Sequence, residues 1–148
     1  MTKFGVQTYT SQELVYEATL EALNDADMSM SDIDAIVSSV VDTSSNGERQ
    51  RGFSSILSSI FKKKVPIITS SAVCGGGGSA LWTANRLDYN NVLVVGAEKL
   101  LTNNSFIITD EILMAAERIY EQSEGLIFPA QNALVAQQYM LKYGATTD

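Results

Sequence analysis

Residues 65–98, VPIITSSAVCGGGGSALWTANRLDYNNVLVVGAE, contain the pattern that decides the fold. Residues 65–69 and 92–97 are short apolar runs rich in β-branched side chains, which predicts two buried strands. Residues 78–87 between them are predicted to be helical. Two parallel strands need a crossover connection of this kind, so the stretch predicts a right-handed βαβ unit.

The segments around this unit continue the alternation of strands and helices. Thr10 and Glu13 form a capping-box pattern at the start of an apolar-periodic run, which predicts a helix over residues 11–26. The other predicted elements are a strand over 34–41, a loop over 42–52, and helices over 53–61, 110–121 and 130–143. This order predicts an α/β layered domain with a mostly parallel central sheet.

The composition excludes several classes of function. The chain has 148 residues and a net charge of −7, which argues against nucleic acid as a partner. It has no apolar run long enough to span a bilayer and no apolar signal core, so we expect a cytoplasmic protein without a membrane partner. A single cysteine excludes an internal disulfide framework and a cysteine-based zinc cluster, so no metal is expected. The absence of histidine removes the commonest general base.

The four glycines at 75–78 first suggest a phosphate or dinucleotide site. A P-loop is excluded because no Gly-Lys pair occurs near them. Gly75, Gly77 and Ala80 fit the dinucleotide pattern G-x-G-x-x-A, and Glu98 ends the next strand, as a ribose-binding acid would. Four glycines match many patterns by chance, however, and the unit lies behind a helix and a strand. We therefore disfavour dinucleotide binding.

In the second interpretation, Cys74 acts as a nucleophile. This cysteine lies where a strand becomes a helix, and the N-terminus of a helix favours the thiolate form that acts as a nucleophile. Small residues after it would let a bulky substrate approach the backbone. The alternative is a buried structural cysteine at a tight turn, since free cysteine is among the most buried residue types. The residues alone leave both open.

Three stretches together resemble the thiolase superfamily. They are SSAVCGGGGSALWTANRL with NNVLVVGAEKL (70–87 and 90–100), FPAQNALVAQQYMLKYGATTD (128–148) and TSQELVYEATLEALNDADMSMSDIDAIV (10–37). They are similar to the N-terminal half of thiolases of the sterol-carrier and archaeal acetoacetyl-CoA type. The resemblance covers most of the chain.

This resemblance implies a thiolase-like acyltransferase of lipid metabolism, of the acetyl-CoA C-acetyltransferase type. Cys74 would be the catalytic residue that carries the acyl group as a thioester, and its backbone N–H would help to stabilise the oxyanion. Acyl-CoA and CoA would be substrates, and no cofactor is implied. Residues 1–148 would form a partial thiolase-like N-terminal domain, with 111–148 leading toward the substrate-covering region.

The chain also departs from the family. Family members are more than twice as long, and their second half supplies histidines and a second cysteine that this chain lacks. We therefore expect a split or truncated enzyme that associates with a second thiolase-half subunit, with copies of itself, or with both. The alternatives are a non-catalytic subunit that scaffolds a CoA-handling complex, and a ketoacyl synthase-like condensing enzyme. The family also has an earlier strand, so the sheet should be short on one side.

Several further side chains receive structural interpretations. Lys62–Lys64 are expected to be a solvated helix end rather than a site for CoA phosphates. Glu98 and Lys99 are expected to have structural roles, and Trp82 is expected to pack in the core under the cysteine turn. The apolar residues proposed for an interface with another subunit are Phe53, Ile56, Phe61, Phe106, Ile107 and Ile108.

Overall fold

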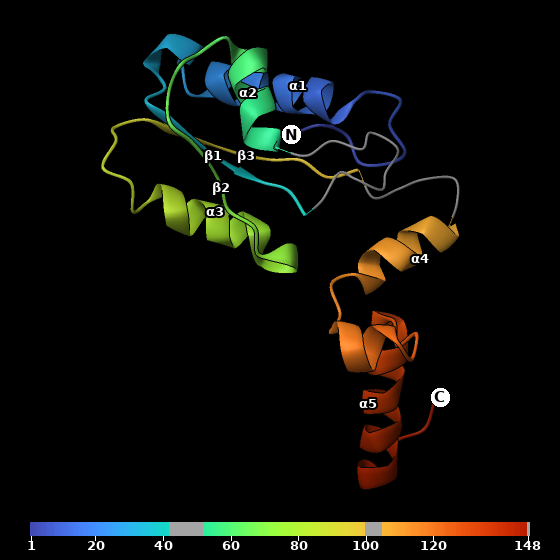
Figure 1. Ribbon diagram of the computed structural model, residues 1–148. Helices are drawn as coiled ribbons and strands as arrows, with labels where there is room; N and C mark the ends of the chain where they lie inside the picture. The colour runs from blue at the N-terminus through green and yellow to red at the C-terminus, as the bar shows by residue number, and fades with distance from the viewer. Residues whose placement is uncertain (42–51, 100–104, 148) are drawn as a thin grey trace. The chain divides into compact units, whose positions relative to one another are not determined.

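The computed structural model describes residues 1–41, 52–99 and 105–147. The chain divides into two compact units, Met1–Thr102 and Asn103–Asp148. The first unit contains a parallel sheet with helices on both of its faces (Figure 1). The predicted α/β class is therefore confirmed.

The sheet has three parallel strands in the order β2-β1-β3. They are β1 (Ala35–Ser39), β2 (Ile67–Thr69) and β3 (Val92–Gly96). Ala35, Ile36 and Val37 of the central strand are completely buried, because helices cover both faces of β1. Among the described residues, β2 and β3 form the two edges of the sheet.

Two helices cover one face of this sheet and a third covers the other (Figure 1). Helices α1 (Ser11–Asp25) and α2 (Phe53–Phe61) lie together on the first face, and α3 (Gly76–Ala84) packs on β1 and β3 from the opposite face. The core lies between the sheet and the first two helices. It is made of Val15, Leu23, Ile33, Ile36, Phe53, Leu57, Leu93 and Val95.

Local signals account for the ends of the first two helices. Thr10 and Glu13 form the predicted capping box, in which the Thr10 side chain accepts from the Glu13 N–H and the Glu13 carboxylate accepts from the Thr10 N–H. Helix α2 ends at Lys62, whose φ of +50° stops the helix. Lys63 then donates to the backbone carbonyls of Met30 and Ser31. This lysine therefore links the α2–β2 connection to the α1–β1 connection.

The second unit is helical and differs from its prediction in one place. It contains α4 (Ser105–Leu113), a π-helical turn (Arg118–Gln122) and α5 (Phe128–Tyr143). A single helix over 110–121 is wrong, because Glu117 is extended and its side chain accepts the Tyr120 N–H, which caps a new turn.

The proposed interface residues have mixed outcomes. Phe53 was wrongly placed at an interface, because it is only 5% exposed and belongs to the core. Ile56 and Phe61 are partly buried against the same core. Phe106 is exposed and Ile108 is half-buried. The Ile107 side chain and residues 42–51 of the predicted loop lie outside the described residues.

Candidate functional site

Cys74 lies in the connection between β2 and α3. It is the middle residue of a short 3-10 helix, η2 (Val73–Gly75), and α3 follows at once at Gly76. The thiol is free and exposed. This exposure excludes the buried structural cysteine and leaves the side chain accessible to a reactant.

The backbone of this turn is strained. Val73 has a φ of +45°, which is a rare conformation for a β-branched residue. Neighbouring bonds hold it in place: the Gly75 N–H donates to the Ala72 carbonyl, and the Ser70 N–H donates to the Ser38 carbonyl of the central strand, both at 2.8 Å. The position of Cys74 is therefore set by its surroundings rather than by local preference.

The four glycines differ in what they do. Helix α3 begins two residues earlier than predicted, so Gly76, Gly77 and Gly78 are helical. A Cβ at Gly76 would lie 2.4 Å from the Ser39 Oγ, whereas a Cβ at Gly77 or Gly78 would meet nothing within 4 Å. Gly76 therefore allows the close approach of α3 to β1, and a Cβ there would force the Ser39 hydroxyl to move. Because Gly77 and Gly78 have no side chains, nothing projects from the helix surface beside the turn at these two positions.

The topology places this turn at a position typical of ligand sites. Helix α2 follows β1 on one face of the sheet, and α3 follows β2 on the other (Figure 1). In open parallel sheets, ligands bind outside the carboxyl ends of neighbouring strands whose connections leave in opposite directions. Cys74 lies in the connection that follows the carboxyl end of β2.

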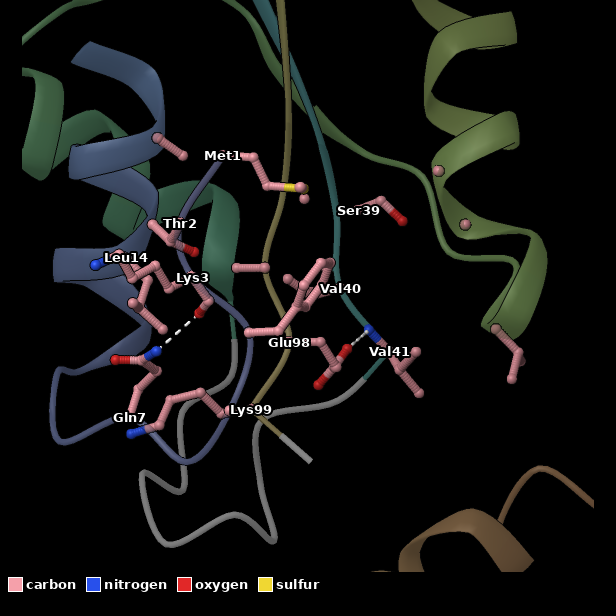
Figure 2. A pocket seen from close by; sticks show the side chains of 18 residues that line it. Met1, Thr2, Lys3, Gln7, Leu14, Ser39, Val40, Val41, Glu98 and Lys99 are labelled. Carbon is pink, nitrogen blue, oxygen red and sulfur yellow. Dashed lines mark hydrogen bonds between the residues drawn. The ribbon is translucent and has the colours of Figure 1, made fainter. Parts of the chain in front are cut away.

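A pocket of about 540 Å³ lies beside the turn (Figure 2). Its walls come from the ends of β1 and β3, the start of α3, the side of α1 and the N-terminal segment. Cys74 does not line it, although Val73, Gly76 and Gly77 do. The other lining residues are Met1, Thr2, Lys3, Phe4, Gly5, Gln7, Leu14, Ala18, Ser39, Val40, Val41, Gly96, Ala97, Glu98 and Lys99.

Three polar side chains of this pocket form hydrogen bonds with the protein backbone. A Glu98 carboxylate oxygen accepts the Val41 N–H at 2.7 Å, which joins the ends of β3 and β1 (Figure 2). Lys99 Nζ donates to the Tyr9 carbonyl, and Gln7 Nε2 donates to the Lys3 carbonyl, also at 2.7 Å. Glu98 and Lys99 thus have structural contacts, as expected.

Trp82 is not in the core, contrary to the prediction. It is 62% exposed, and the Arg86 guanidinium lies 4.7 Å from its ring centre. The reason is the helical period: Gly76 and Ala80, four residues apart, face the sheet, so Trp82 points away from it. The spacing of these two small residues was the signal in the sequence that could have placed the helix face correctly.

Within residues 1–41, 52–99 and 105–147, none of the helices has the length and apolarity needed to cross a membrane.

No family model matches the sequence. The chain is 26% identical over 152 residues to an acetyl-CoA acetyltransferase of Methanothermobacter thermautotrophicus, covering 99% of the chain and 39% of the relative. It is 31% identical over 133 residues to a beta-ketoacyl-[acyl-carrier-protein] synthase III of Staphylococcus haemolyticus, covering 83% of the chain and 42% of the relative. The chain thus spans about two-fifths of the length of these curated relatives. Both similarities support the resemblance to the thiolase superfamily, and neither singles out a sub-type.

Proposed function

We propose that this chain is the acyl-accepting part of a thiolase-superfamily enzyme and forms an acyl thioester on Cys74. The observation that carries the proposal is the exposed cysteine at the carboxyl edge of a parallel sheet, directly before α3. The two similarities support an acyltransferase or a condensing enzyme. The finer assignment to an acetyl-CoA C-acetyltransferase rests on the resemblance of the cysteine turn and the flanking segments.

The reaction needs a thiolate, a stabilised oxyanion and a proton acceptor. The Cys74 sulfur attacks the carbonyl carbon of an acyl-CoA, a new S–C bond forms, and the bond from that carbon to the CoA sulfur breaks. The proton lost by Cys74 leaves with CoA as its thiol. Backbone N–H groups at the start of α3 favour negative charge at this place. These 148 residues contain no histidine, and we propose that the base is supplied from outside them.

We propose that a second thiolase-half subunit covers the outer face of α3 and brings this base. That face carries Cys74, Gly77 and Gly78, followed by Leu81 and Trp82, which are 63% and 62% exposed. Two glycines beside two large apolar side chains leave a shallow surface into which another helix can pack closely. The relatives contain more than half of their length outside the matched region, which could correspond to such a partner.

The second candidate is a ketoacyl synthase-type condensing enzyme. It is favoured by the 31% identity to the Staphylococcus haemolyticus protein. Both candidates use an acyl thioester on Cys74, and they differ in the second substrate. A thiolase-type enzyme would return the acyl group to CoA, whereas a condensing enzyme of this type would pass it to a carrier-protein thioester. A non-catalytic scaffold would leave Cys74 inert to acyl-CoA.

An exchange experiment tests the proposal. Unlabelled acetyl-CoA is incubated with isotopically labelled free CoA and the protein, with and without any protein that co-purifies. Reversible acyl transfer through Cys74 predicts label in the acetyl-CoA pool for wild type and none for Cys74→Ala. Exchange that persists in Cys74→Ala, or is absent from folded wild type under both conditions, would contradict the proposal.

A further inference from the structure

We propose that the pocket beside the cysteine turn holds the hydrocarbon chain of the acyl group, so that thioesters with acyl chains longer than acetyl are accepted as substrates in addition to acetyl-CoA. This inference rests on the proposed acyl transfer by Cys74. It assigns a ligand class to the pocket lined by the ends of β1 and β3, the start of α3 and the N-terminal segment (Figure 2).

The size and the chemistry of the pocket favour an apolar ligand. A volume of about 540 Å³ lies within the range of ordinary small-molecule sites. The side chains that line it are largely apolar, and they come from five parts of the fold. They include Met1, Phe4, Leu14, Ala18, Val40, Val73 and Ala97.

Three polar side chains of the lining already make hydrogen bonds. Glu98 accepts the Val41 N–H, Lys99 donates to the Tyr9 carbonyl, and Gln7 donates to the Lys3 carbonyl. A phosphate or ribose would have to compete with these bonds, whereas a hydrocarbon chain leaves them intact. These three bonds therefore favour an acyl chain over a dinucleotide near Gln7, Glu98 and Lys99, and Thr2, Lys3 and Ser39 supply the other polar side chains of the lining.

Gly77 connects the pocket to the cysteine. It lines the pocket together with Val73 and Gly76, and these three residues lie on both sides of Cys74 in the turn and at the start of α3. A Cβ at Gly77 would meet nothing within 4 Å. An acyl chain attached to the Cys74 sulfur can therefore pass over Gly77 into the pocket without meeting a side chain at this position.

The test compares reagents of increasing chain length that react with the thiol without an acyl-transfer mechanism. Alkyl methanethiosulfonates are suitable: the Cys74 thiolate attacks the sulfur that bears the alkyl group, a disulfide forms, and methanesulfinate leaves. Each buried methylene group contributes up to about a fourfold preference. We expect the hexyl reagent to modify Cys74 at least about tenfold faster than the methyl reagent, since part of the chain remains in water.

Gly77→Leu and Gly78→Leu form a matched pair of variants. Both glycines are helical with open space around them, but only Gly77 lines the pocket. The measured quantity is the ratio of the hexyl rate to the methyl rate, because this ratio cancels any general loss of access to the thiol. We expect Gly77→Leu to reduce the ratio to near one, Gly77→Ala to reduce it partly, and Gly78→Leu to keep it.

Two results would overturn the inference: a wild-type ratio near one, or equal loss of the ratio in Gly77→Leu and Gly78→Leu. Circular dichroism of each variant checks that it is folded. The proposed acyl transfer is tested separately with acetyl- and hexanoyl-CoA. A chain-length preference toward the thiosulfonates, without any adduct from either CoA ester in the presence or absence of a co-purifying protein, would refute the transfer reaction and keep the pocket assignment. An adduct from a CoA ester without a chain-length preference toward the thiosulfonates would refute the pocket assignment and keep the transfer reaction.

Discussion

Replacing Gly76 with alanine places a methyl group 2.4 Å from the Ser39 Oγ, at the point where α3 crosses the end of β1. This distance is far below van der Waals contact, so the Ser39 side chain or the helix must move. The next atom, the Ser39 Cβ, lies at 3.7 Å, which is an ordinary contact. The conflict is therefore confined to one hydroxyl oxygen.

Two opposing contributions determine how much Gly76→Ala changes the free energy of unfolding. Overpacking of this kind costs about 1–3 kcal/mol. Gly76 has helical angles, φ −56° and ψ −43°, so alanine is compatible with the backbone and gains about 0.4–1 kcal/mol through a less flexible unfolded chain. Gly76→Ala should thus lower the free energy of unfolding by about 1.3 kcal/mol at the middle of both ranges, and by at most about 2.6 kcal/mol.

Ser39→Ala removes the conflicting oxygen and serves as the partner variant in a double-mutant cycle. Ser39 is half-buried, and its single replacement should change stability by about 0.5 kcal/mol or less. In that background, Gly76→Ala should become stabilising by about 0.4–1 kcal/mol. Urea unfolding followed by far-ultraviolet circular dichroism measures all four proteins, and the predicted coupling energy is about 1–3 kcal/mol. If Gly76→Ala changes stability equally in both backgrounds, the Ser39 hydroxyl does not conflict with a Cβ at position 76.

Three further predictions concern stability. Thr10→Ala removes the capping-box acceptor of the Glu13 N–H and should lower the free energy of urea unfolding by about 1 kcal/mol, whereas Thr8→Ala, outside the box, should not. Leu57→Ala, at a completely buried core position, should lower it by about 2–5 kcal/mol, and an effect below that of an exposed leucine such as Leu81→Ala would contradict the described core. Hydrogen bonds from the Ser29 hydroxyl and backbone N–H hold the pKa of Asp32 below its ordinary value of 3.8, so its ionised form stabilises the fold above that pH. This contribution should be lost as the pH falls below 3.8 through the folded-state pKa, and Asp32→Asn should weaken the acid dependence of the thermal midpoint; an unchanged dependence would contradict it.

The elements with strong local signals could be predicted from the sequence. The capping box at Thr10 placed α1 correctly, and the apolar spacing after Gly52 placed α2 at Phe53–Phe61. The β-branched run in β1 predicted a strand buried on both faces. In each case the local preference and the tertiary packing agree.

The wrong predictions concern features of the structure that depend on contacts between residues distant in the sequence. Glycine has a low helix propensity, which moved the predicted start of α3 beyond Gly76, yet a Cβ at this position would conflict with the Ser39 hydroxyl. Trp82 is a large apolar residue and was therefore assigned to the core, although the face of α3 that packs on the sheet is set by Gly76 and Ala80. The break before the Arg118–Gln122 turn depends on the extended backbone of Glu117, in a segment with helical composition.

The candidate site was predicted in part. Cys74 was placed correctly at a strand-to-helix turn, but its exposure could not be decided from residue preferences, and its catalytic role stays a prediction. The pocket was not predicted, because it joins the N-terminal segment to the ends of β1 and β3, which lie as many as 98 residues apart in the chain between Met1 and Lys99. No local pattern reports such a contact.

Intact mass after incubation with acetyl-CoA is the measurement that tests the central claim most directly. Wild type and Cys74→Ala are compared, alone and with any protein that co-purifies. We expect one acetyl group on wild type, either alone or only when the co-purifying protein is present. We expect none on Cys74→Ala. A folded wild-type chain that gains no acetyl group under either condition, or a Cys74→Ala chain that gains as much as wild type, would contradict the central claim.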